Sequence, residues 1–107
     1  MIEPRHDIFR ALGDPTRRAL FQRLAVEGEL SVRALTEGGT VSQPAVSQHL
    51  KALREAGLVA EQRVGRTVLY RADPEGLTPL IDWMALYAVF WRERFDELEK
   101  LLKETHP

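Results

Sequence analysis

The 107-residue sequence predicts a mainly α-helical domain that carries one small β-hairpin. Two observations support this fold class. Across most of the chain, apolar residues recur every three or four positions, as they do on the buried face of an amphipathic helix. Residues 58–72 are instead rich in Val, Leu and Tyr around a central Gly65-Arg66 pair, which is typical of two strands joined by a tight turn. The length fits a single domain over residues 1–107.

Two helices are expected at the N-terminal end of the chain. The first covers about residues 4–12, and Gly13 ends it. The second begins at Asp14-Pro15, because the carboxylate can cap the helix and proline fits the first turn. This second helix ends near Glu27-Gly28.

A pair of helices over residues 31–57 is expected next. Ser31 is the predicted N-cap of a short helix over residues 32–37, and the Gly38-Gly39-Thr40 segment interrupts it. Ser42 then caps a longer helix that Gly57 ends. The helical period places three apolar residues of this longer helix on one face: Val46, Leu50 and Leu53. A short helix, a Gly-containing turn and a second helix form a helix-turn-helix unit.

The expected hairpin, or wing, covers residues 58–72, with strands over 58–64 and 67–72. A turn at residues 73–76 leads into one long helix from about Thr78 to Lys103. Its apolar residues are spaced by three or four positions, which is close to the seam of a coiled coil. They include Leu80, Met84, Tyr87, Trp91, Phe95, Leu98 and Leu102.

Charge is unevenly distributed, although the formal net charge is only −1. Residues 1–41 are neutral overall, residues 42–72 carry +3, and residues 73–107 carry −4. DNA attraction requires a local positive face rather than a basic average, although a chance excess explains +3 equally well. The chain has no Cys, which excludes disulfides and thiolate metal sites. No signal segment or bilayer-length apolar run is visible, so a cytoplasmic protein without a membrane partner is expected.

The helix-turn-helix unit indicates binding to double-stranded DNA, because an α-helix fits the major groove, where base edges can be distinguished. The predicted DNA-binding residues are Ser42, Gln43, Pro44, Ser47, Gln48, Lys51, Arg63 and Arg66. Those expected to read bases are Gln43, Ser47 and Gln48, and those expected to hold phosphates are Ser42, Lys51, Arg63 and Arg66. Arg66 is also a candidate for the minor groove. A helix face that is simply solvated is the alternative explanation of these polar residues.

Three segments of the chain resemble the ArsR family of winged helix-turn-helix repressors. They are DPTRR at 14–18, SQPAVSQHLKALREAGLV at 42–59 and GRTVLY at 65–70, and the similarity covers about residues 7–72. The C-terminal helix resembles the metal-independent autorepressor branch of that family through Trp83, Tyr87, Phe90 and Trp91. The resemblance implies a repressor that occludes a promoter, often its own, until an inducer of unknown identity releases it.

The resemblance also implies a winged helix-turn-helix with N- and C-terminal dimerisation helices. A homodimer on a pseudo-palindromic operator is expected, joined mainly by the first and last helices. The residues expected at this interface are Ile8, Phe9, Leu12, Leu80, Met84, Tyr87, Trp91, Phe95 and Leu98.

No metal site and no cofactor are expected. Metal sensors of the family bind through Cys on the third helix, or through His and carboxylates on the last helix. Here residues 31–33 are Ser-Val-Arg, and the last helix contains no His. A site formed by His6 and His106 is the alternative, but two exposed terminal histidines are favoured over it.

Several alternatives stay open. His49 is expected to pack or bond inside the helix-turn-helix, with DNA contact as the second possibility. The aromatic residues of the last helix favour an interface core over an inducer pocket. No motif of an enzyme is visible. The remaining functions are an interaction module without specific DNA binding, a metal-responsive repressor with a non-standard site, and an activator.

Overall fold

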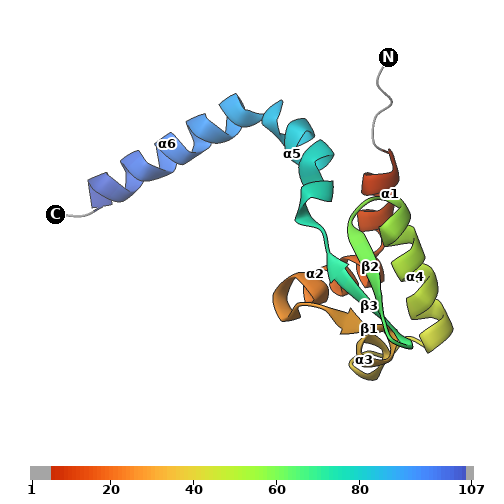
Figure 1. The fold of residues 1–107 in the computed structure, drawn as a ribbon. Helices are drawn as coiled ribbons and strands as arrows, with labels where there is room; N and C mark the ends of the chain where they lie inside the picture. Colours follow the sequence, from red (N-terminus) through yellow and green to blue (C-terminus); the bar gives the residue numbers. More distant parts are fainter. Residues whose placement is uncertain (1–5, 106–107) are drawn as a thin grey trace, which may run out of the picture.

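The computed structural model describes residues 6–105 of the chain, with side chains from residue 8 to residue 104. In this part of the chain, a group of helices and a small sheet form the body of the molecule, and the last helix extends away from it (Figure 1). The elements are α1 (His6–Gly13), α2 (Pro15–Glu27), β1 (Leu30–Ser31), α3 (Val32–Glu37), α4 (Gln43–Glu55), β2 (Val59–Val64), β3 (Thr67–Ala72), η1 (Pro74–Leu77), α5 (Thr78–Ala85) and α6 (Ala88–Thr105).

The helix starts expected from the sequence are confirmed by side-chain caps. Asp14 accepts hydrogen bonds from the backbone N–H groups of Thr16 at 2.8 Å and Arg17 at 3.2 Å, and Pro15 follows in the first turn. Ser31 Oγ accepts a hydrogen bond from the backbone of α3 at 3.1 Å. Residues 4 and 5, where the first helix was expected to begin, lie outside the described residues.

The core forms where α1, α2, α3 and α4 meet the sheet. Its buried members are Ile8, Ala11, Leu20, Leu24, Leu35, Val46, Leu50, Leu53, Leu58 and Val59. The predicted apolar face of α4 is confirmed, because all three of its residues are fully or almost fully buried. One expectation needs correction: Ile8 is 2% exposed and belongs to this core, whereas it was expected at the interface between two chains.

The sheet contains three antiparallel strands in the order β1-β3-β2, so the expected hairpin is extended by a strand that was not predicted. β1 consists of two residues, Leu30 opposite Tyr70 and Ser31 opposite Leu69, which is too short to show strand alternation. The hairpin closes with Val64 opposite Thr67. Gly65 has a φ of +64° between them, a conformation that glycine adopts without strain.

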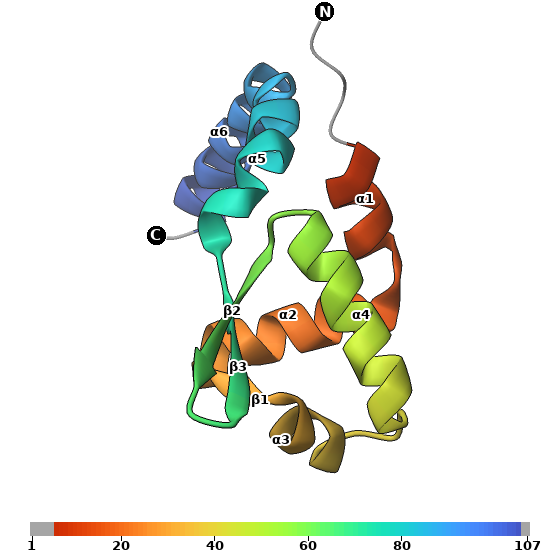
Figure 2. The ribbon, with the colours of Figure 1, turned by 45° about the vertical axis from the view of Figure 1, so that its right-hand side comes forward.

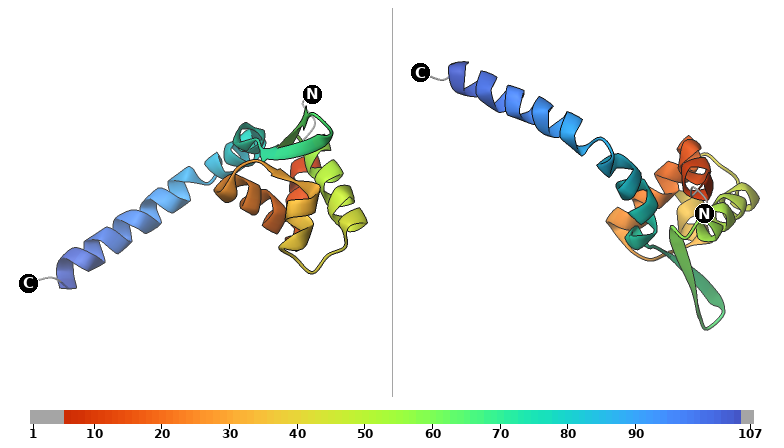
Figure 3. Two further views of the ribbon diagram at one scale, coloured as in Figure 1. Left: turned by 60° about the horizontal axis from the view of Figure 1, so that its bottom comes forward. Right: turned by 90° about the horizontal axis from the view of Figure 1, so that it is seen from above.

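The single long helix expected after the wing is two helices, α5 and α6, separated at Leu86 and Tyr87. At this break, the N–H of Leu86 donates to Trp83 O at 3.2 Å and the N–H of Tyr87 to Met84 O at 3.0 Å. These bonds span three residues instead of four, so the last turn of α5 tightens and the chain changes direction. Figure 1 and the left view of Figure 3 show α6 extending away from the body, whereas Figure 2 views α6 nearly along its axis.

A close backbone approach fixes where the C-terminal helices leave the body. A Cβ on Gly76 of η1 would lie 2.0 Å from the carbonyl oxygen of Gly57, at the end of α4. The N–H of Asp73 also donates to Leu58 O at 2.8 Å. Only glycine at position 76 permits this approach, which holds η1 against the segment between α4 and β2. None of the helices in the described part of the chain is both long and apolar enough to span a membrane.

Candidate nucleic-acid interface

The side of α4 that faces away from the core carries small polar and basic side chains. The helix begins after Ser42, whose Oγ accepts a hydrogen bond from Ala45 N at 3.4 Å, and Pro44 lies in its first turn. The side chains predicted to meet DNA are all exposed here: Ser42, Gln43, Pro44, Ser47, Gln48 and Lys51. Because the opposite side is anchored in the core, α4 presents these groups from a rigid support.

Arg23 of α2 holds α3, the first helix of the unit, in place. Its Nη1 donates to Leu35 O at 3.1 Å and its Nη2 donates to Ala34 O at 3.2 Å. Its Nε donates to Glu27 at 2.9 Å, which orients the guanidinium. The side chain thus satisfies carbonyl groups in α3 that lack partners within the helix. This role could not be predicted from local sequence patterns, because the contacts join residues 11 and 12 positions apart.

Arg17, in the DPTRR segment, joins three helices. Its Nε donates to Ala11 O at 2.8 Å and its Nη2 to Arg10 O at 2.9 Å, at the end of α1. Its Nη1 lies 3.5 Å from Nδ1 of His49 in α4. The half-buried imidazole therefore lies inside the motif, as expected. The hydrogen bond from the backbone N–H of Arg17 is the largest effect on the half-buried Asp14 carboxyl, and it lowers the pKa of that group. Desolvation opposes this effect, and the N–H of Thr16 adds to it.

The wing lies beside α4 and carries two exposed arginines. Arg63 is opposite Val68 in the strand pair, and Arg66 is the second residue of the turn at the tip. At the base of the wing, Glu61 forms an ion pair with Arg54 near the end of α4. Both α4 and the wing lie on the side of the body away from α6 (Figure 3).

The charges on this side are predominantly positive and largely unpaired. In the described part of the chain, no ion pair is found for Lys51, Arg63 or Arg66. By contrast, Arg54 is neutralised by Glu61. Burial, with a further contribution from its hydrogen bond to Glu61, raises the pKa of the neighbouring Tyr70. The arrangement offers hydrogen-bonding groups along α4 and unpaired cations on α4 and on the wing. These groups suit a polyanion whose base edges accept and donate hydrogen bonds.

Comparison with known proteins agrees with this geometry. A family model described as a helix-turn-helix domain matches residues 12–62. The HTH-type transcriptional regulator Rv2034 of Mycobacterium tuberculosis is 49% identical over 72 residues, which are 67% of this chain and 66% of the relative. The arsenic resistance transcriptional regulator ArsR1 of Pseudomonas putida is 46% identical over 68 residues, 64% of this chain and 53% of the relative. The chain thus spans between half and two thirds of the length of these relatives.

Solved structures match over more of their length. A possible transcriptional regulator for arsenical resistance has a TM-score of 0.65 at 38% identity, and the match covers 99% of this chain and 100% of that one. An ArsR family transcriptional regulator, RHA00566, has a TM-score of 0.71 at 30% identity, with 81% and 89% covered. The chain belongs to the ArsR family of transcriptional regulators. It is therefore a winged helix-turn-helix protein of a class that is not enzymatic.

One further ArsR-type structure bears on assembly. The homodimeric winged helix-turn-helix DNA-binding domain of Mb0332 from Mycobacterium bovis has a TM-score of 0.63 at 28% identity, with 78% of this chain and 76% of that one covered.

The interface residues expected from the ArsR resemblance differ in where they lie. Leu12 and Leu80 are half-buried and pack on the core of one chain. The exposed residues of the set are Phe9, Met84, Tyr87, Trp91, Phe95 and Leu98. Phe9 of α1 meets Trp83 of α5 edge-to-face with ring centroids 5.5 Å apart, so the two terminal regions already touch within one chain. The break after α5 separates this group from the aromatic side chains of α6.

The structure also bears on the expectation that the chain has no metal site on its third or last helix. Among the described residues, no group of three or more His, Cys, Asp or Glu side chains is placed to hold a metal ion. The side chain of His6 and all of His106 lie outside the described residues.

Proposed function

We propose that this ArsR-family chain is a DNA-binding transcriptional repressor that acts as a homodimer on a pseudo-palindromic operator. The observation that carries the proposal is the two-sided character of α4. Its apolar residues Val46, Leu50 and Leu53 are buried, while its exposed side presents small polar and basic groups together with Pro44, and the wing carries unpaired arginines. A helix of this kind fits the major groove of B-DNA.

Each exposed group of the interface has a role in this proposal. Amide and hydroxyl groups in the first turns of α4, those of Gln43, Ser47 and Gln48, read base edges. The cations Lys51 and Arg63, together with the Ser42 hydroxyl, hold phosphates. The position of Arg66 at the wing tip allows a phosphate contact or entry into the minor groove.

Assembly as a homodimer is supported by the apolar surface of the C-terminal helices. Residues 81–104 are all exposed in the single chain, although many of them are large and apolar. An exposed apolar surface of this extent marks an interaction site. The homodimeric Mb0332 domain, which has the same fold, supports pairing of two copies. In the proposed dimer, the two α4 helices contact half-sites about one DNA turn apart, roughly 34 Å.

An interaction module without specific DNA binding is the main competing function. Such a module presents an apolar recognition face. None of the large exposed apolar side chains found in the described residues belongs to α4. The outward face of α4 therefore favours DNA over protein as its partner.

Fluorescence anisotropy with purified protein tests the proposal directly. The probe is the DNA upstream of the gene, a scrambled duplex is the comparison, and each is titrated over a series of salt concentrations. We expect tighter binding to the upstream duplex and affinity that falls as salt rises, because phosphate contacts release counterions. Equal, weak binding to both duplexes would remove autoregulation and favour a distant operator or the interaction module.

Substitution of Gln43 separates base reading from general attraction. We expect Gln43→Ala to cost about 1–3 kcal/mol at the specific site and to relax base preference there. The matched control is Gln22→Ala, which removes an exposed amide from α2. Equal loss of affinity for specific and scrambled DNA would contradict the base-reading role.

A further inference from the structure

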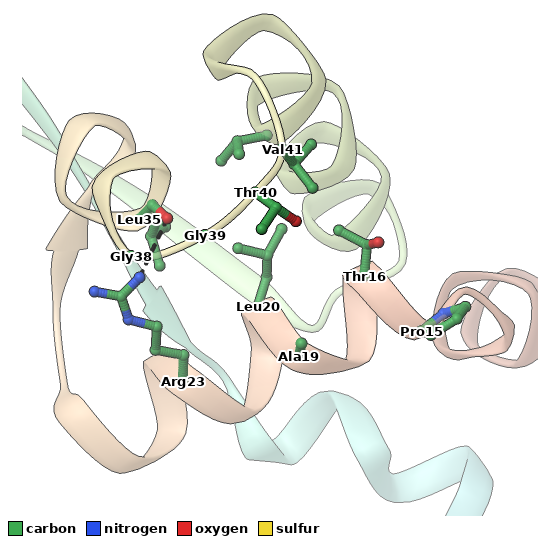
Figure 4. A pocket seen from close by; sticks show the side chains of 11 residues that line it. Pro15, Thr16, Ala19, Leu20, Arg23, Leu35, Gly38, Gly39, Thr40 and Val41 are labelled. Carbon is green, nitrogen blue, oxygen red and sulfur yellow. Dashed lines mark hydrogen bonds between the residues drawn. The ribbon is translucent and has the colours of Figure 1, made fainter.

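A pocket of about 320 Å³ lies behind the DNA-facing surface, between α2 and the turn that joins α3 to α4. Figure 4 shows Ala19 and Leu20 along α2, with Thr40 and Val41 of the turn on the other side of the space. Leu35 of α3 contributes to the lining. The volume lies at the lower end of the range of sites that bind small molecules.

The lining is mainly apolar, with one cationic group at its edge. Two positions of the turn, Gly38 and Gly39, contribute no side chain, which leaves the space open. Arg23 lines the pocket from α2, and its guanidinium lies against Gly38, where a Cβ would be 2.3 Å from Nη1. The hydroxyl residues Thr16 and Thr40 complete the polar part of the lining, and an apolar cavity with a few polar groups is the usual composition of a small-ligand site.

The hydrogen-bond inventory of Arg23 leaves capacity for a ligand. A guanidinium has five N–H donors. Among the described residues, three acceptors are found for them: Glu27, Leu35 O and Ala34 O. One N–H on each of Nη1 and Nη2 therefore remains available. Each of these N–H groups can donate a charge-assisted hydrogen bond to a carboxylate oxygen.

We propose that this pocket binds a small carboxylic acid with an apolar body, of the size of benzoate. The apolar body occupies the space between Ala19, Leu20 and Val41, and the carboxylate accepts a hydrogen bond from a free N–H group of Arg23. Glu27 keeps its hydrogen bond from Nε, so the ligand and Glu27 bind different N–H groups of the same guanidinium. Nothing covalent is involved.

Occupancy of the pocket would also act on DNA binding, and this part of the inference rests on the proposed function. The same Arg23 side chain holds two carbonyl groups of α3, and the pocket wall includes the turn before α4. A ligand that draws the guanidinium away and separates the turn from α2 therefore displaces the helix-turn-helix unit. Ligand and DNA then weaken each other by the same factor, typically about 5-fold or more.

The first experiment measures ligand binding without DNA. Sodium benzoate is titrated into ¹⁵N-labelled protein at constant ionic strength, and amide shifts are followed by NMR. We expect saturable shifts concentrated in residues 15–23 and 38–46. Benzamide, which lacks the charge, is expected to bind at least about tenfold more weakly, because a charge-assisted pair contributes more than a neutral hydrogen bond.

Two leucine substitutions on α2 locate the site. Ala19→Leu fills the pocket from an exposed helix position, so we expect it to weaken benzoate binding at least about tenfold while the fold is retained. Ala25→Leu adds the same side chain at an exposed position of α2 outside the pocket and is expected to leave benzoate binding unchanged. Absence of saturable shifts, or shifts that Ala19→Leu does not reduce, would overturn the proposed site.

The second experiment repeats the anisotropy titration with and without benzoate. A rise in Kd for DNA that Ala19→Leu abolishes supports the regulatory role. Benzoate binding that leaves the DNA affinity unchanged overturns that role while the ligand site stands. A protein that binds benzoate but no DNA at all contradicts the proposed function and not the site, so the two failures are distinguishable.

Discussion

Two arginines of α2 stabilise the fold by binding backbone carbonyl groups of neighbouring helices. Arg17 binds the end of α1 and contacts His49 of α4, while Arg23 binds α3. Carbonyl groups at helix ends have no partner within the helix, and they require one when they are shielded from water. Each guanidinium therefore adds polar links between helices that also share the apolar core.

Replacement of Arg17 by Met tests this role. We expect Arg17→Met to lower the free energy of unfolding by about 1–3 kcal/mol, because partly buried carbonyl groups lose charge-assisted hydrogen bonds. The control is Arg33→Met, since Arg33 is exposed and the ion pair found for it among the described residues is with Glu37 on the same helix. Its expected effect is below about 0.5 kcal/mol. Urea denaturation followed by circular dichroism gives both values, and equal effects would contradict the special role of Arg17.

Because Asp14 caps α2, the free energy of unfolding is expected to vary with pH in the acid range. The backbone hydrogen bonds from Arg17 and Thr16 lower the pKa of Asp14 in the folded chain. The unfolded chain therefore takes up this proton first as pH falls, so the stability that Asp14 contributes is present above its ordinary pKa and lost below it. Asp14→Asn keeps an acceptor but does not titrate. We expect the Tm difference between the two proteins to narrow as pH falls from 7 to 3, and a constant difference would contradict this assignment.

At the scale of elements, the ion pair between α4 and the wing joins the two parts of the proposed DNA-binding surface. Arg54 and Glu61 join them, and Tyr70 of β3 contacts Glu61 from the neighbouring strand. Gly65 allows the turn that places Arg66 at the wing tip. The wing is therefore fixed relative to α4 at its base and presents its cation at the far end.

The wing contact is testable by its salt dependence. We expect Arg66→Ala to weaken binding to all sequences alike and to reduce the slope of log K against log salt by about 1, because one phosphate contact is lost. Arg92→Ala in α6 removes an exposed cation from a region away from this surface. The control should leave the slope unchanged, and an unchanged slope for Arg66→Ala would refute the wing contact.

The whole molecule is elongated, with extents of 61 × 43 × 23 Å and a radius of gyration of 18.4 Å, because α6 leaves the body. Within one chain, the large apolar side chains of α6 lack a core to cover them. Trp91, Phe90 and Phe95 contact one another, yet all three are at least 47% exposed. A second copy is the partner that the proposed dimer supplies.

Removal of Trp91 should therefore weaken dimerisation. We expect Trp91→Ala to cost about 3–5 kcal/mol of association free energy, because loss of a buried aromatic ring leaves a cavity. Val26→Ala on α2, where the side chain is 77% exposed, is the control and should have no effect. Sedimentation equilibrium measures both, and an unchanged dimer for Trp91→Ala would exclude Trp91 from the interface.

Much of the architecture could be predicted because its signals are local. Caps such as Ser31 and Ser42 and the apolar period of α4 depend on residues within one or two helical turns. The unpredicted features depend on distant partners or lack a sequence marker. β1 forms only because β3 lies beside it, and the break at Leu86-Tyr87 contains neither Gly nor Pro.

The same limit applies to the candidate site. Periodicity placed Ile8 on an apolar face, but it does not tell whether that face meets the chain's own core or another copy. Sequence patterns could not predict the roles of Arg17 and Arg23 or the pocket beside α2, because these depend on which helices meet in space. The exposed residues of α4 and the wing were foreseen as candidates, and their contacts with DNA stay a prediction.

The main-chain contact between Gly76 and Gly57 affects the spacing of the two half-sites that the proposed dimer binds. The atoms that touch are backbone on both sides, so no change of rotamer can relieve a substitution there. The end of α4 and the start of the C-terminal helices therefore keep a fixed position relative to each other. Half-site spacing becomes a property of backbone geometry, independent of the side chains that read the bases. Substitutions on α4 can then change the base preference while the distance between the two half-sites stays the same.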